Sequence, residues 1–186
     1  VGVFNDITVF VTDTKGGTAR QTFSITVTEQ PPALVINEIL VNPPADSTGD
    51  ANGDGALVRE QDVFVEIVNA SDDSVSLAGW SILAGMANCD SSSSGLKIRH
   101  LFGDDVVLPP QEALVVFGGG ELRGDFGLAQ AFVASEGSLG LESGTVELHL
   151  SAPEFGLVSQ IKLCDLTAEG QSLSRDPDIS GAVSYT

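Results

Sequence analysis

Five carboxylates crowd one short stretch of this sequence, residues 46–62, and a single arginine accompanies them. The carboxylates belong to Asp46, Asp50, Asp54, Glu60 and Asp62, and the arginine is Arg59. Like charges at this density repel one another unless a cation lies among them. The composition of the stretch, which we call the acidic loop, therefore predicts a cation site.

The spacing of the oxygen-bearing side chains fits an EF-hand-like calcium loop. Asp50, Asn52 and Asp54 occupy positions 1, 3 and 5, and Gly55 stands at position 6, where the chain must turn sharply. The carbonyl oxygen of Ala56 would be the ligand at position 7. Ligands that are all oxygen favour calcium over zinc.

Position 12 departs from this pattern, because Gln61 stands where an acidic bidentate ligand is expected. One extra residue in the loop would let Asp62 serve instead. We expect a structural calcium ion with a Kd of roughly 10⁻⁴ to 10⁻³ M. The alternative interpretation is that residues 52–55 only build tight turns and leave their carboxylates in water.

Other polar residues form no catalytic pattern in the sequence. Glu38 and Glu66 lie in predicted strands and would approach each other if those strands pair, but no second catalytic feature accompanies them. His100 and His149 lack a ligand spacing to another histidine or to cysteine, so we expect both on strand surfaces. The sequence predicts that the chain is not an enzyme.

Two short motifs have simpler interpretations. The three glycines at residues 118–120 lack the lysine, serine and helix of a phosphate-binding loop, so they predict a turn. Arg123-Gly124-Asp125 matches an adhesive tripeptide, but a match of three residues often arises by chance. Neither motif adds a functional prediction.

The two cysteines, Cys89 and Cys164, allow one intramolecular pairing. In an oxidising compartment they could form a disulfide that joins a loop to a late strand. They could also be free, buried thiols. The sequence leaves both alternatives open.

The chain has 186 residues and a formal charge of 8 − 26 = −18, which places negative potential over most of its surface. Such a surface repels phosphate backbones, so we expect no direct binding of nucleic acid. No run approaches ~18 consecutive apolar residues, so we expect no membrane span. Cations are the natural small partners of this chain.

The elements that must position these residues are strands. Apolar residues recur with a period of two, and Gly, Asp, Ser and Pro fill the gaps, which predicts an all-β fold. The predicted strands are residues 7–12, 21–28, 34–40, 63–69, 76–83, 97–102, 113–117, 146–150 and 158–163. Residues 122–134 could hold a short helical turn or an edge strand.

Gln30-Pro31-Pro32 predicts a boundary between two domains, residues 1–30 and 31–186, because paired prolines cannot donate hydrogen bonds to a sheet. The first domain would be a hairpin with one apolar face. A lone hairpin is marginal in water, so we expect this face to pack on the downstream domain or on another chain. Because Val1 begins inside a strand pattern, we expect a piece of a longer chain whose export signal lies upstream.

From Leu34 onward, the order of sequence signals resembles that of a lamin-tail domain. The signals are Ile36-Asn37-Glu38-Ile39-Leu40, the acidic loop, residues 64–69, and residues 75–82 with the only tryptophan, Trp80, followed by residues 99–102, 108–117 and 171–175. The resemblance implies an immunoglobulin-like β-sandwich without an active site of its own. The first thirty residues resemble the last two strands of a cadherin-like or immunoglobulin-like repeat from large exported bacterial proteins.

These observations together predict a non-catalytic, calcium-stabilised module that acts as an interaction or spacer element in an exported bacterial protein. Its partner would be another protein or a neighbouring domain of the parent chain, and a homodimer could form through the hairpin. Two alternatives remain: an accessory domain of an extracellular nuclease or phosphatase, and a carbohydrate-binding or surface-adhesion module. The second alternative needs exposed aromatic platforms, whereas aromatic residues are only 6% of the chain.

Overall fold

The computed structural model describes residues 2–27, 33–86, 95–142, 144–166 and 170–185. The chain folds into two compact units, residues 1–31 and residues 32–186.

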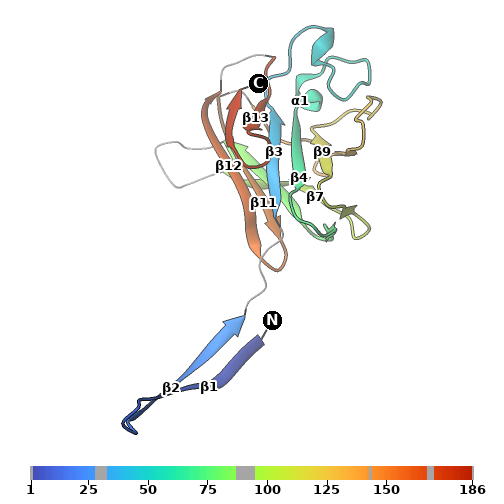
Figure 1. Ribbon diagram of the computed structural model, residues 1–186. Coiled ribbons are helices and arrows are strands. Elements are labelled where there is room, and N and C mark those ends of the chain that lie inside the picture. The colour runs from blue at the N-terminus through green and yellow to red at the C-terminus, as the bar shows by residue number, and fades with distance from the viewer. Residues whose placement is uncertain (1, 28–32, 87–94, 143, 167–169, 186) are drawn as a thin grey trace. The chain divides into compact units, whose positions relative to one another are not determined.

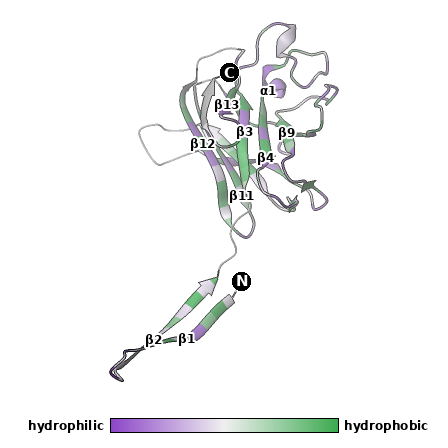
Figure 2. Ribbon diagram, viewed as in Figure 1, coloured by the Kyte–Doolittle hydropathy of each residue, from purple (hydrophilic) through white to green (hydrophobic). Residues whose placement is uncertain are grey.

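The first unit is an antiparallel hairpin of β1 (Gly2–Thr12) and β2 (Thr18–Val27). The Oδ1 atom of Asp13 accepts hydrogen bonds from the N–H groups of Lys15 and Gly17, which closes the turn. Along β2, apolar and polar side chains alternate, as the colouring of Figure 2 shows. The exposed apolar side chains of the hairpin are Val3, Phe4, Val9, Phe10, Val11, Phe23, Ile25 and Val27.

The second unit contains two main sheets (Figure 1). The six-stranded sheet has the order β10-β9-β4-β3-β13-β14, and the four-stranded sheet has the order β12-β11-β6-β7. The strands of the first are β3 (Leu34–Leu40), β4 (Phe64–Asn69), β9 (Ala113–Phe117), β10 (Gln130–Val133), β13 (Leu173–Asp176) and β14 (Ala182–Tyr185). Those of the second are β6 (Ser81–Met86), β7 (Lys97–Leu101), β11 (Gly144–Ala152) and β12 (Gly156–Leu166), and β5 (Val75–Ser76) pairs with β8 (Val107–Leu108).

Alternating side chains from both sheets form one apolar core. Val65 and Ile67 of β4, Ile82 of β6, and Leu148 and Leu150 of β11 are all buried in it. Trp80 also lies in this core, as the sequence predicts. The unit is therefore an immunoglobulin-like β-sandwich, which confirms the predicted fold class.

Several predicted strands need correction. Residues 76–83 are not one strand, because the chain turns between β5 and β6, where the N–H of Trp80 donates to the carbonyl of Leu77. Residues 130–133 form an edge strand, not a helical turn, and pair in parallel with β9. The strands β13 and β14 were not among those expected, and neither were the short helices η1 (Ser47–Gly49) and α1 (Arg59–Asp62). Within the described residues, no helix has the length and apolar character needed to cross a bilayer.

Candidate functional site

The acidic loop connects β3 to β4, and η1 and α1 lie within it. Asp46 begins η1, and its side chain accepts a hydrogen bond of 2.9 Å from the N–H of Thr48. This is the usual role of an aspartate at a helical N-terminus. Asp46 therefore organises the start of the loop and lies outside the predicted calcium ligands.

Hydrogen bonds bring together three of the residues predicted to bind calcium. The N–H of Asp54 donates to Oδ1 of Asp50 (3.1 Å) and to Oδ1 of Asn52 (3.0 Å), so these two oxygens converge on one donor. Oδ2 of Asp50 accepts from the N–H of Gly55 (2.9 Å), and Oδ1 of Asp54 accepts from the N–H of Ala56 (2.8 Å). Gly53 and Gly55 have positive φ angles of 73° and 87°, a backbone conformation that favours glycine.

Asp62 makes backbone hydrogen bonds within the loop. Its side chain is buried, and both carboxylate oxygens accept backbone hydrogen bonds: Oδ1 from Ala51 (3.0 Å) and Asn52 (3.4 Å), and Oδ2 from Val58 (3.0 Å). Burial raises the pKa of Asp62, and the negative charge of Asp50 adds to the rise. Asp62 therefore ties the end of the acidic loop to residues 51, 52 and 58 within it.

The acidic loop packs against a segment that follows β9, residues 118–124, which we call the docking segment. Asn52 makes the central contacts and is completely buried. Its Nδ2 donates to the carbonyl of Gly119 (3.1 Å), and its own carbonyl accepts from the N–H groups of Arg123 and Gly124 (3.0 Å each). Oδ2 of Asp54 accepts from the N–H of Glu121 (3.2 Å).

The glycines of the docking segment leave room for this contact. A Cβ on Gly118 would stand 2.0 Å from the carbonyl oxygen of Glu60, and a Cβ on Gly120 would stand 2.3 Å from Nδ2 of Asn52. Both distances are too short for non-bonded atoms. The prediction of a simple turn missed this role, although three consecutive glycines after a strand are a signal of close backbone approach.

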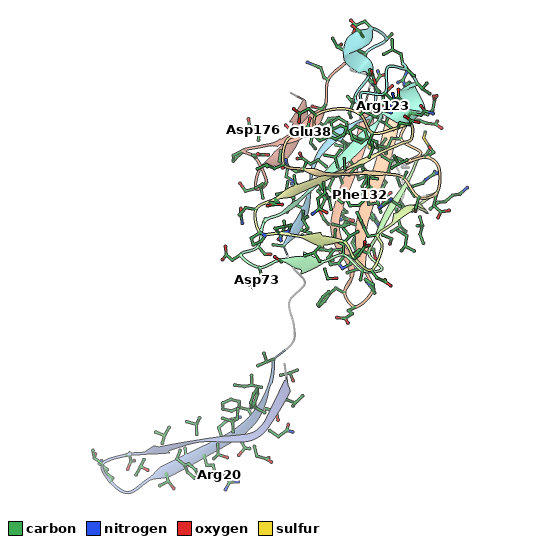
Figure 3. All side chains as sticks on the ribbon, turned by 90° about the vertical axis from the view of Figure 1, so that its right-hand side faces the viewer. Arg20, Glu38, Asp73, Arg123, Phe132 and Asp176 are labelled. Carbon is green, nitrogen blue, oxygen red and sulfur yellow. The ribbon has the colours of Figure 1, made fainter. Side chains whose placement is uncertain are left out.

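The adhesive-like tripeptide begins near the end of the docking segment with Arg123, which is labelled in Figure 3. Arg123 is largely exposed and forms an ion pair with Glu121, and Oδ1 of Asp125 accepts from the N–H of Gly127 (3.0 Å). The backbone of Arg123 and Gly124 is thus fixed to the acidic loop, and the charged side chains of Arg123 and Asp125 have local partners.

Oxygen is the only ligand type that the acidic loop offers. Among the residues that the structure describes, no three or more His, Cys, Asp or Glu side chains are placed as a metal-holding group. Asp50, Asn52 and Asp54 are nevertheless joined by a shared N–H donor, and each of their carboxylate or amide oxygens can accept more than one interaction. These oxygens fit a hard cation that takes mixed carboxylate, amide and carbonyl ligands.

The paired strands β3 and β4 bring Glu38 opposite Glu66, as expected if the strands pair. Nδ2 of Asn37 donates to Oε1 of Glu66 (2.7 Å), and Oδ1 of Asn37 accepts from the N–H of Ile179 (2.9 Å). Burial raises the pKa of Glu66, and the charges of Glu38 and Asp178 raise it further. Through these two hydrogen bonds, Asn37 joins Glu66 of β4 to the segment after β13.

The histidines and cysteines are placed in different environments. His100 is buried beside Phe102 and Phe132, so the expectation of a strand-surface residue is wrong for it. Its Nδ1 accepts from the N–H of Ser135 (3.2 Å), and burial lowers its pKa. His149 of β11 is half-buried, with Nε2 3.0 Å from Oε1 of Glu147. Cys164 is disulfide-bonded, and Cys89 lies outside the described residues.

Comparison with known proteins agrees with this architecture. The family model described as Lamin Tail Domain matches residues 28–165. A search of curated proteins finds none that matches the chain. The family is a non-catalytic, immunoglobulin-like module, in accordance with the two-sheet sandwich and its single core. The chain belongs to the lamin tail domain family.

Proposed function

We propose that this chain is an interaction or spacer module of an exported bacterial protein, and that calcium bound in the acidic loop stabilises it. The observation that carries the proposal is the convergence of Asp50 and Asn52 on the N–H of Asp54, within a loop that already uses backbone hydrogen bonds to hold its carboxylates together. A divalent cation supplies what the loop lacks, namely positive charge among its oxygens.

The ligands of the ion would be side-chain oxygens of Asp50, Asn52 and Asp54 and the carbonyl of Ala56. The negative charge of Asp62 would also attract the ion. Asp62 would bind the ion directly if one of its carboxylate oxygens gave up a backbone hydrogen bond. Burial is the main cause of the raised pKa of Asp62, and the cation would offset the smaller contribution from the charge of Asp50. Because the ligands come together only in the folded loop, binding stabilises the folded unit by mass action.

The expected size of this effect is measurable. With a Kd of roughly 10⁻⁴ to 10⁻³ M, about 10 mM calcium stabilises the unit by about 1.4 to 2.7 kcal/mol. For a unit of this size, that corresponds to a rise in Tm of about 3 to 10 °C. The assay is thermal unfolding of the full chain in calcium and in EDTA, followed by circular dichroism.

Matched variants separate a loop site from a general charge effect. Asp50→Asn removes a proposed ligand charge and should abolish most of the calcium-dependent rise in Tm. Asp104→Asn removes an equal charge from an exposed position outside the loop and should leave the rise intact. The readout is the difference between calcium and EDTA for each variant, so a general loss of stability does not affect it. An unchanged Tm of the natural chain on adding calcium would refute the calcium proposal.

The disulfide at Cys164 supports the exported setting, because disulfides persist in oxidising compartments. The hairpin supports an interaction role. Its apolar side chains, including Phe4, Phe10 and Phe23, are exposed, and a two-stranded hairpin alone is marginally stable. We propose that a neighbouring domain of the parent protein, or another protein, covers this surface.

Hydrogen exchange tests the hairpin part of the proposal. If another surface covers the hairpin, the amides of β2 exchange slowly. Sedimentation then shows whether the chain is a monomer, in which the hairpin is covered by the same chain, or a dimer, in which a second copy covers it. If the amides of β2 exchange as fast as those of an unfolded chain, this chain by itself has no partner for the hairpin, and the proposed parent protein must be tested in its place. Rapid exchange in the parent protein as well would refute the interaction role of the hairpin.

A further inference from the structure

Asn52 and Gly53 form the only Asn-Gly pair in the sequence. In such a pair the backbone nitrogen of the glycine can attack the side-chain amide carbon of the asparagine, because glycine has no Cβ to hinder the approach. Asparagine is accordingly one of the residues that limit the chemical lifetime of proteins. The question for this chain is whether its fold permits the reaction.

The docked loop opposes the reaction at both ends of the Asn52 amide. Nδ2 donates to the carbonyl of Gly119, and Oδ1 accepts from the N–H of Asp54. The side chain is completely buried, and the Cα of Gly124 packs closely against Gly53. The amide cannot turn toward the nitrogen of Gly53 without breaking these contacts.

We propose that Asn52 is a deamidation site that the fold protects, and that opening of the acidic loop from the docking segment exposes it. In the open loop, a bond forms between the nitrogen of Gly53 and Cγ of Asn52, and the Cγ–Nδ2 bond breaks. The proton of the Gly53 N–H passes to Nδ2, which leaves as ammonia, and the product is a succinimide. Water then hydrolyses either ring carbonyl and gives aspartate or isoaspartate.

The product does not fit back into the docked arrangement. A carboxylate at position 52 has no donor for the carbonyl of Gly119, so two acceptors would face each other in a buried site. It also adds a negative charge to a loop in which Oδ1 of residue 52 shares the N–H of Asp54 with Asp50 and the N–H of residue 52 donates to the buried Asp62. Isoaspartate in addition lengthens the main chain and displaces the carbonyl that accepts from Arg123 and Gly124. Deamidation therefore acts as a one-way release of the acidic loop.

The test follows deamidation of the full chain in mildly alkaline buffer by peptide mapping and mass spectrometry. Every sample contains EDTA, so the result does not depend on the calcium proposal. Asn52 of the folded natural chain should react at least about tenfold more slowly than in urea, because protection follows local unfolding. Equal rates in the two conditions would overturn the proposal.

Two glycine variants test whether docking is the source of protection. Gly120→Ala places a methyl group 2.3 Å from Nδ2 of Asn52, so it should undock the loop and bring the rate of the folded chain toward that in urea. Gly127→Ala is the matched control, since Gly127 also has a positive φ but a Cβ there meets nothing within 4 Å. If the two variants deamidate at the same rate while circular dichroism shows both folded, docking does not gate the reaction.

The product mimic Asn52→Asp provides a second readout that needs no chemistry. It should lower Tm in EDTA and speed proteolytic cleavage within the acidic loop. Asn5→Asp, at an exposed position of the hairpin, should do neither. An Asn52→Asp variant that melts and resists protease like the natural chain would show that the carboxylate is accommodated, and the one-way release would be refuted.

Discussion

The substitution Gly118→Ala tests how the docking segment receives the acidic loop. A Cβ on Gly118 would stand 2.0 Å from the carbonyl oxygen of Glu60 and 2.8 Å from Cγ2 of Val63. The first is a main-chain atom of α1 and cannot move without moving the helix. The N–H of Gly118 also donates to the carbonyl of Val63 (2.8 Å). Relieving the clash by moving the backbone of residue 118 would therefore strain this hydrogen bond.

Gly119→Ala is a matched control one residue away. Both glycines are buried, and neither has a positive φ, so backbone strain does not separate them. A Cβ on Gly119 would meet Cγ of Gln61 at 3.0 Å, and this side chain can move aside. Alanine also lowers the entropy of the unfolded chain, which offsets part of the crowding.

The expected magnitudes follow from these contacts. Overpacking against a fixed backbone atom costs about 1 to 3 kcal/mol, so Gly118→Ala should lower Tm by about 2 to 12 °C for a unit of this size. Gly119→Ala should change the free energy of unfolding by less than about 1 kcal/mol.

Urea denaturation and thermal unfolding of the two variants measure both quantities. Equal losses for Gly118→Ala and Gly119→Ala would refute the reasoning, because it rests on the different atoms that the two Cβ atoms meet. A larger loss for Gly119→Ala would refute it as well.

Three further predictions concern buried polar groups. Asn69→Ala removes the side-chain donor to the carbonyls of Leu108 and Pro109, so it should lower the free energy of unfolding in urea by about 2 to 3 kcal/mol. Asn5→Ala, at an exposed position, should not lower it measurably. Burial raises the pKa of Glu66 above 4.5, so the charged side chain destabilises the fold at neutral pH. Glu66→Gln should therefore be more stable than the natural chain at pH 7, and this difference should disappear as the pH falls through the raised pKa of Glu66. A difference in stability that persists at low pH would contradict this cause. Burial lowers the pKa of His100, so below a pH of about 6.5 the unfolded chain binds a proton at His100 that the folded chain does not. The natural chain should therefore lose more stability than His100→Gln when the pH is lowered from 7. Parallel curves of unfolding free energy against pH for the two proteins would show that the pKa of His100 is the same in the folded and unfolded chains.

The sequence alone determined the elements whose patterns are local. The short runs rich in apolar residues at 34–40 and 113–117, bounded by proline, asparagine, glutamate and glycine, predicted β3 and β9 with their observed bounds. The sequence also determined the composition of the acidic loop and the order of signals that indicates a lamin tail domain. Each of these features can be read within a short window of residues.

Only the tertiary structure decided which distant segments meet. Asn52 contacts Gly119, 67 residues away, and the local sequence of neither residue specifies the other. The same holds for the burial of His100 beside Phe132 and for the parallel pairing of β10 with β9. The sequence shows that Asp62 belongs to the acidic loop, but only the fold shows that three backbone N–H groups donate to its carboxylate. Loop carboxylates have several competing partners, and the path of the whole chain decides which of them come within reach.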